Sequence, residues 1–197
     1  MNITPEQTDA LRELMNIGVG RAAGVLNEMV GFRVLLQVPF VKALSPPDLK
    51  KDAGEMGRYR VSAVRLGFEG LFSGTAALVF PPDSACKLVS VLTGEEPGTP
   101  DLDSVRAGTL MEVGNIVING VMGSISNLLK EHISYSLPAY IEDTVESLLT
   151  AGAGSEKSTV LLVRTRFMIQ QLQIEGDVIL LFEVGCFEKL LSAIDRL

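Results

Sequence analysis

The chain has 197 residues, of which 47% are hydrophobic and 21% are charged, and its formal net charge is −7. These values are typical of a compact domain, or of one domain built from two similar halves, and they exclude a disordered chain. The negative charge and the absence of Trp argue against a nucleic-acid partner, because phosphate binding needs clustered Lys and Arg and base stacking needs aromatic side chains.

The cysteines and the single histidine exclude several catalytic classes. Cys86 and Cys186 form neither a zinc motif nor a CxxC redox pair, so we expect both to be small core residues in a reducing compartment. Any Ser-His or Cys-His pair would need His132, whose place beside Glu131 instead predicts a solvated side chain. The N-terminus lacks a signal-peptide pattern and no apolar run could span a bilayer, so we expect a cytoplasmic protein without membrane insertion.

The first predicted element is a long helix. Thr4, Pro5 and Gln7 form a helix-start signal, and Gly31 is a natural stop. Between them an apolar stripe recurs at steps of three and four, through Leu11, Met15, Val19, Ala22, Leu26 and Val30. The segment GVGRAAG lies inside this stripe and matches no phosphate-binding motif, which favours close helix packing.

Strands and a short helix follow the first helix. Residues 32–41 predict a strand, and residues 44–58 have the composition of a loop. Residues 59–68 and 74–81 predict a hairpin. Asp83 is expected to cap a short helix over 84–93 that Gly94 closes, and residues 95–101 predict a linker.

The same order of elements then recurs. A second long helix is expected to start at Asp101 or Asp103, with an apolar stripe formed by Leu110, Gly114, Val117, Val121, Ile125 and Leu128. A strand over 133–141, a loop over 141–158 and a hairpin over 159–169 and 176–184 follow. Residues 186–197 predict a last helix.

This recurrence predicts a single domain, residues 1–197, made of two repeats at about 5–94 and 101–197. Equivalent residues are 99 apart in the long helices, and the offset reaches 102 in the last strands. We expect an α+β fold: a pseudo-two-fold αβ sandwich with a mostly antiparallel sheet and long paired helices. Because the duplication supplies its own two-fold packing, we expect a monomer.

Each long helix carries the same polar pair, Glu13 with Asn16 and Glu112 with Asn115. A step of three residues places both side chains on one helix face, one turn apart. Neither pair has a Lys or Arg at the i+4 positions, so we expect both pairs to face solvent and to await an external partner. A purely structural role for the pairs is the alternative interpretation.

Each pair lies in a stripe separate from the apolar stripe of its helix. The first polar stripe contains Asp9, Glu13, Asn16, Gly20, Ala23 and Asn27. The second polar stripe contains Gly108, Glu112, Asn115, Asn119, Met122 and Ser126. Small residues along the first stripe would let another surface come close.

The spacing of these residues resembles the Asp/Ser-x3-Glu-x2-Asn-x22-Pro signature of the CheC/CheX/FliY chemotaxis phosphatases. The first copy fits in full, with Asp9, Glu13, Asn16 and Pro39. The second copy has Glu112, Asn115 and Pro138, but Gly108 replaces the leading residue. The resemblance extends over nearly the whole chain.

The resemblance implies a phosphatase that removes the aspartyl phosphate of a CheY-like response regulator. It implies that Glu13 and Glu112 pair with the regulator's active-site lysine, and that Asn16 and Asn115 orient the attacking water. It implies no cofactor of the chain's own, with Mg²⁺ on the regulator, and it raises the deamidase CheD as a further partner. Pro39 and Pro138 would shape the backbone.

Two other functions stay open from the sequence. The first is a binding module without catalysis, such as a flagellar-switch-like domain of the FliM kind or a CheD-binding scaffold. FliM-like domains resemble this fold but lack the Glu/Asn pairs, so the pairs favour the phosphatase. The second is a ligand sensor built on the duplicated cleft, for which the sequence names no ligand.

Overall fold

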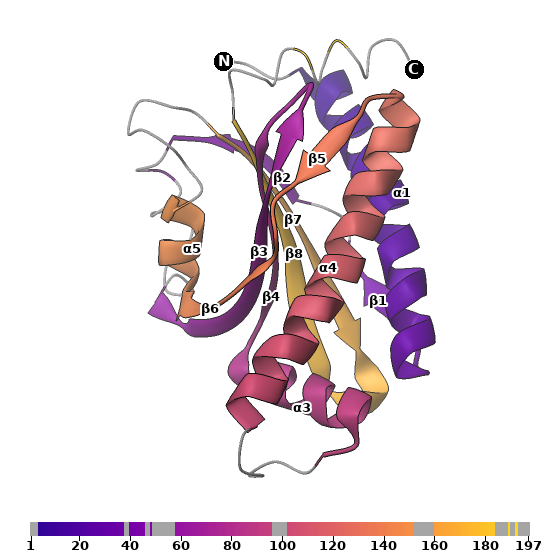
Figure 1. The fold of residues 1–197 in the computed structure, drawn as a ribbon. Coiled ribbons are helices and arrows are strands. Elements are labelled where there is room, and N and C mark those ends of the chain that lie inside the picture. The colour runs from indigo at the N-terminus through magenta and orange to yellow at the C-terminus, as the bar shows by residue number, and fades with distance from the viewer. Residues whose placement is uncertain are drawn as a thin grey trace.

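The computed structural model describes residues 4–37, 40–45, 48, 58–95, 102–151, 160–183, 189 and 192. One sheet forms the centre, with the helices α1, α3 and α4 against one face and α5 against the other (Figure 1). The helices span Pro5–Val30 (α1), Pro82–Thr93 (α3), Leu102–Leu129 (α4) and Val145–Ala151 (α5). No helix in these ranges is both long and apolar enough to cross a membrane.

The sheet has eight strands, and every strand pair in it is antiparallel. The strands of the first repeat are Leu35–Leu36 (β1), Phe40–Leu44 (β2), Arg60–Gly70 (β3) and Gly74–Phe80 (β4). Those of the second are Ile133–Tyr135 (β5), Ala139–Thr144 (β6), Val160–Ile169 (β7) and Ile174–Glu183 (β8). A 3₁₀ turn, Gln170–Leu172 (η2), joins the last two strands.

The two repeats exchange their edge strands. The central strands β8 and β4 are neighbours, while β1 and β2 pair with β7 of the other repeat and β5 and β6 pair with β3. The register repeats with the sequence offset, since Leu36 pairs with Phe167 and its equivalent Tyr135 pairs with Phe68. The fold is therefore the expected α+β sandwich with pseudo-two-fold symmetry.

The change of offset from 99 to 102 has a local cause. The connection from Phe167 to Gly176 is three residues longer than the equivalent connection from Phe68 to Gly74. The extra residues extend the β7–β8 hairpin and its turn. The strands on either side of the turn keep equivalent partners.

The start of α1 confirms its predicted signals. Thr4 Oγ1 accepts a hydrogen bond from the Gln7 backbone N–H at 3.2 Å, and the Gln7 side chain accepts one from the Thr4 N–H at 3.1 Å. This capping box satisfies two of the helix's orphan donors. Gly31 ends α1 in the left-handed region, with φ 71°, which glycine adopts without steric cost.

Two local predictions are wrong. Asp83 does not cap α3, because the helix begins two residues earlier than predicted, with Pro82 at its first position, and no side chain caps it. Residues 145–151 form α5 rather than a loop, capped where Thr144 Oγ1 accepts from the Ser147 N–H at 3.2 Å. The predicted strand over 32–41 is divided between β1 and β2, and the predicted last helix lies outside the described residues.

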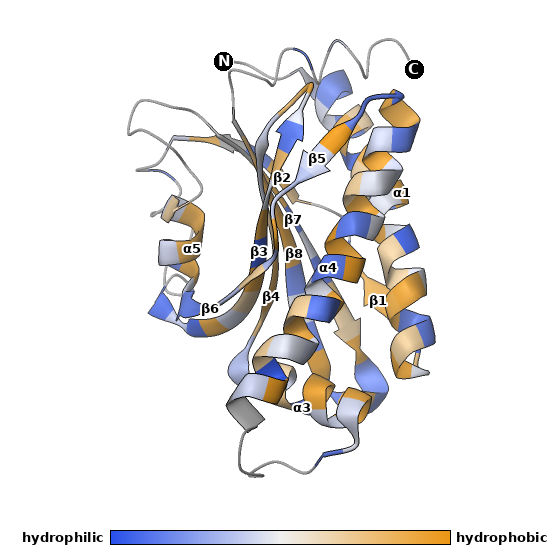
Figure 2. Cartoon of the chain, viewed as in Figure 1, coloured by the Kyte–Doolittle hydropathy of each residue, from blue (hydrophilic) through white to orange (hydrophobic). Residues whose placement is uncertain are grey.

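A large core lies between the sheet and the helices, and a smaller one lies on the far face under α5. Aromatic contacts in the large core follow the symmetry: the rings of Phe68 and Phe182 are 5.3 Å apart, and those of Phe167 and Phe80 are 5.6 Å apart. Both long helices carry alternating hydrophobic and hydrophilic bands, as expected for helices with one face on a core (Figure 2).

Candidate functional site

The candidate site is the outer surface of the helix pair α1 and α4, which run antiparallel along one face of the sheet (Figure 1). Their backbones approach closely at Gly18, where a Cβ would lie 3.0 Å from the carbonyl oxygen of Val121. Gly18 therefore serves the close packing predicted for its segment. Gly20 and Gly24 do not, since a Cβ at either position would meet no neighbouring atom within 4 Å and both residues are exposed.

This contact fixes the relative position of the two polar pairs. Asn16 precedes Gly18 by two residues on α1, and Asn115 precedes Val121 by six residues on α4, which runs the other way. At 1.5 Å per residue, the two asparagines are about 12 Å apart along the helices. The two pairs are thus offset from each other along the same helical layer.

The first pair is open to solvent. Glu13 and Asn16 are both exposed, and within the described part of the chain no side chain forms a hydrogen bond or ion pair with either. The leading motif residue Asp9 instead pairs with Arg12, with 3.1 Å between Oδ1 and Nη1, and both side chains are largely exposed. An exposed ion pair of this kind contributes little to stability. Asp9 bonds to Arg12 and not to Glu13 or Asn16.

The second pair differs in its surroundings. Glu112 is exposed, but Asn115 is half-buried, and Asn119 Nδ2 donates a hydrogen bond of 2.8 Å to Asn115 Oδ1. The absence of Lys and Arg at the i+4 positions does not predict this contact, which joins two amide side chains. Amide pairs at i and i+4 also meet on a helix surface, and the Asn-x3-Asn spacing was the available signal.

The second polar stripe is less continuous than predicted. Met122 is fully buried, whereas its equivalent in the first stripe, Ala23, is half-buried. Both positions lie on the flank of their stripe, and the longer methionine side chain reaches the core from there. Gly108, the position that departs from the family pattern, is exposed with open space around it.

Pro138 occupies a break in the edge of the sheet. Between β5 and β6 the edge strand advances by four residues while its partner β3 advances by three, so one residue is unpaired. Such a bulge at an edge tolerates a residue without an N–H. The strands β1 and β2 show the same step against β7, but Pro39 itself lies outside the described residues.

The remaining candidates for chemistry lie elsewhere. His132 is exposed, as predicted. Cys86 is not a core residue: it is half-buried, and Arg106 Nη1 donates to its Sγ at 3.5 Å, while Cys186 lies outside the described residues. The Cys86 contact, together with Glu142 at 3.3 Å from Nη2, raises the pKa of Arg106. This group links α3, α4 and β6.

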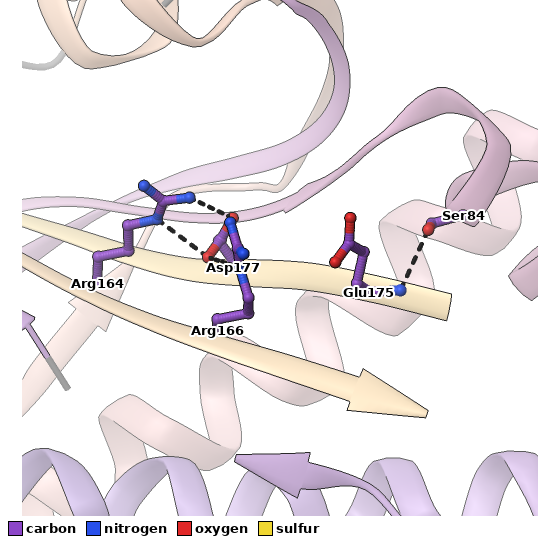
Figure 3. Close-up of polar contacts among 5 residues, drawn as sticks. All are labelled: Ser84, Arg164, Arg166, Glu175 and Asp177. Carbon is purple, nitrogen blue, oxygen red and sulfur yellow. Dashed lines mark hydrogen bonds and ion pairs between the residues drawn. The ribbon is translucent and has the colours of Figure 1, made fainter. Parts of the chain in front are cut away.

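A second polar cluster lies on the far face of the sheet, around a cavity of about 310 Å³ (Figure 3). Arg164 binds Asp177 through two hydrogen bonds of 3.0 and 2.8 Å, and Arg166 lies 3.6 Å from the same carboxylate. At the end of β8, Ser84 Oγ accepts from the Glu175 N–H at 3.1 Å. The arginines are thus already paired, and we interpret this cluster as structural.

Each of the two long helices carries a carboxylate and a carboxamide one turn apart on its outer surface. Across the described ranges, no three His, Cys, Asp or Glu side chains come together as metal ligands. A carboxylate can pair with an ammonium group, and a carboxamide can both donate to and accept from one water molecule. Such a surface can orient groups that a partner brings, and neither side chain type is itself a typical nucleophile for phosphoryl transfer.

Comparisons with known proteins agree on one family. Residues 6–42 match the CheC-like family, and residues 62–160 match the chemotaxis phosphatase CheX. The CheY-P phosphatase CheC of Bacillus subtilis (strain 168) is 27% identical over 205 residues, which cover 98% of this chain and 95% of that protein.

Two solved structures share the fold. FliY of Thermotoga maritima is 21% identical, with a TM-score of 0.79, and the match covers 100% of this chain and 99% of that chain. The CheX–CheY–BeF₃–Mg²⁺ complex of Borrelia burgdorferi contains a chain that is 20% identical, with a TM-score of 0.57, covering 87% of this chain and 98% of that one. With a family match over half of its length and a relative over nearly all of it, this chain belongs to the CheC/CheX/FliY family of chemotaxis proteins.

Proposed function

We propose that this protein is a phosphatase that hydrolyses the aspartyl phosphate of a CheY-like response regulator. The observation that carries the proposal is the Glu/Asn pair that recurs on two antiparallel helices of a protein in this family, with three of its four side chains exposed and Asn115 half-buried. Two relatives support it: one is named a CheY-P phosphatase, and another has been crystallised with CheY, BeF₃ and Mg²⁺.

The regulator brings most of the reaction centre in this mechanism. Its aspartate carries the phosphoryl group and its Mg²⁺ neutralises the phosphoryl oxygens, so our protein needs no cofactor of its own. Water attacks phosphorus in line with the aspartyl oxygen, the bond from phosphorus to that oxygen breaks, and inorganic phosphate and a free carboxylate result. Catalysis then depends on positioning.

Each Glu/Asn pair divides the positioning between its two residues. The carboxylate of Glu13 or Glu112 pairs with the ammonium group of the regulator's active-site lysine and fixes the docked orientation. The carboxamide of Asn16 or Asn115 inserts beside the phosphoryl group and holds the attacking water in line. Both roles need side chains that a partner can reach on a rigid element: Glu13, Asn16 and Glu112 are exposed and Asn115 is half-buried. A long helix with one buried face provides the rigidity.

The test is the decay of a phosphorylated CheY-like receiver domain, measured with and without the protein. Asn16→Ala combined with Asn115→Ala is expected to abolish the accelerated decay, because loss of one positioned polar group in a catalytic site typically costs about 10²–10³ in rate. Asn127→Ala is the matched control: this exposed asparagine lies on α4 outside the polar stripe. An unchanged rate in the double variant would refute the proposed function.

The same assay separates a catalyst from a scaffold. A binding module that is flagellar-switch-like or recruits the deamidase CheD would bind its partner without shortening the lifetime of the phosphate. Each single variant would show how the activity is divided between the two pairs. We also propose that the protein acts as a monomer, which sedimentation of the free chain would test.

A further inference from the structure

We infer that Asn119 is a positioning residue that makes the second Glu/Asn pair different from the first, an inference that rests on the proposed function. Asn119 Nδ2 donates a 2.8 Å hydrogen bond to Asn115 Oδ1, the amide assigned to water orientation. The equivalent position on α1 is Gly20, whose surroundings are open to at least 4 Å. We call the hydrogen bond from Asn119 to Asn115 the amide clamp; the second site has it and the first site does not.

The clamp restricts how the Asn115 carboxamide can present itself. An exposed asparagine turns freely about its two side-chain torsions, and its amide group can face either way. With Oδ1 held by Asn119, the carboxamide keeps one orientation, with Nδ2 and one remaining oxygen lone pair available to a water molecule. Asn16 lacks this restriction, because no described side chain bonds to it.

The two asparagines also differ in how far they are buried. Asn115 is half-buried while Asn16 is exposed, although both occupy the same position of the repeat. Asn119 itself is exposed and lies one turn beyond Asn115 on the same helix face. It can therefore hold the amide from the side without covering it. Pre-organisation of this kind lowers the cost of ordering a side chain in the transition state.

The two sites also differ at the first position of the motif, which is Asp9 in the first copy and Gly108 in the second. The second copy lacks both Asp9 and its partner Arg12, since Gly108 and Met111 occupy the equivalent positions. The first site thus has an ion pair on the turn before its glutamate, whereas the second has an amide clamp on the turn after its asparagine.

The experiment isolates each site in the full-length protein. In the Asn16→Ala background only the second site remains, and Asn119→Ala is expected to lower kcat there about three- to fivefold, the worth of one exposed hydrogen bond, with KM unchanged. In the Asn115→Ala background only the first site remains, and Gly20→Asn is expected to raise its kcat by a similar factor. Asn127→Ala again serves as the control in both backgrounds.

Several outcomes would overturn the inference. One is an Asn119→Ala variant with unchanged kcat in the second-site background. Another is an equal loss from Asn119→Ala in the Asn115→Ala background, which would mean that Asn119 acts on docking or stability and not through Asn115. A third is the absence of any activity in Asn16→Ala alone. None of these depends on the double Asn16/Asn115 variant, whose unchanged rate would instead refute the proposed function.

Discussion

Gly114 lies directly before Asn115, about 100° from it around the helix, and faces the sheet, where it allows a quantitative test of how α4 packs on β3. A Cβ on Gly114 would lie 2.5 Å from both Cβ and Cγ1 of Val64, a fully buried residue of β3. A rotation of the valine side chain cannot relieve this contact, because its own Cβ is one of the atoms involved. Since carbon atoms in contact lie about 3.5–4.0 Å apart, Gly114→Ala forces α4 away from β3 by about 1 Å.

The cost follows from two opposing effects. Alanine favours a helix over glycine by about 1 kcal/mol, while overpacking a filled core typically costs about 1–3 kcal/mol. Gly108→Ala is the matched control, because it lies on the same helix and its surroundings are open. Gly108→Ala should gain only the stability that comes from the higher helix propensity of alanine. We therefore expect the free energy of unfolding of Gly114→Ala to be lower than that of Gly108→Ala by about 1–3 kcal/mol.

Urea denaturation followed by circular dichroism measures this difference, and thermal unfolding should show it as roughly 3–10 °C in Tm for a chain of this size. The same displacement should lower the activity of the second site in the Asn16→Ala background, since catalytic geometry tolerates shifts of only about 0.5 Å. A Gly114→Ala variant as stable as Gly108→Ala would show that α4 does not rest on β3 as described.

Two further predictions concern groups outside the helix surface. Asp177→Asn should lower the free energy of unfolding by about 1–3 kcal/mol, because it weakens the hydrogen bonds to Arg164, but the phosphatase rate per folded molecule should stay the same; a change in that rate would assign the cluster a functional role. Asp143 accepts a hydrogen bond from Ser147 Oγ, which lowers the pKa of its carboxyl below the ordinary value of 3.8. The resulting stabilisation is present above this ordinary value and is lost as the pH falls through the folded-state pKa. The difference in urea midpoint between the wild type and Asp143→Asn should therefore shrink from about pH 5 to about pH 2, and a constant difference would contradict the assignment.

The features predicted well from sequence are those set by local chemistry. The α1 capping box and the Gly31 stop depend on residues within one helical turn of each other, so the residue types suffice to predict them. The apolar stripe of α1 likewise predicts its buried face, from Leu11 to Val30. The hairpin over β3 and β4 is similarly local, since alternation and a short glycine-containing connection define it.

The features that were missed depend on contacts between distant segments or on a narrow choice of side-chain partners. Nothing in the strand patterns says that β2 pairs with β7 or that β6 pairs with β3, because each strand would suit either edge of the sheet. The helix α5 was not predicted because its seven residues are too few for a clear periodic pattern. The bond between Asn115 and Asn119 joins two uncharged amides, so a search for charged partners at the i+4 positions does not predict it.

The strand exchange also indicates where any difference between the two sites must originate. Strand pairs in one repeat have equivalents in the other with the same register, and the three-residue insertion is confined to the β7–β8 turn. The strands beneath the two long helices are therefore arranged equivalently, although Asn16 is exposed and Asn115 is half-buried. Most side chains of the two long helices differ between the repeats, and those one turn from the Glu/Asn pair include Gly20, replaced by Asn119, and Asp9, replaced by Gly108. If the two sites act at different rates, Asn119 and Gly108 are the first positions to test, because each stands one turn from the Glu/Asn pair of the second site.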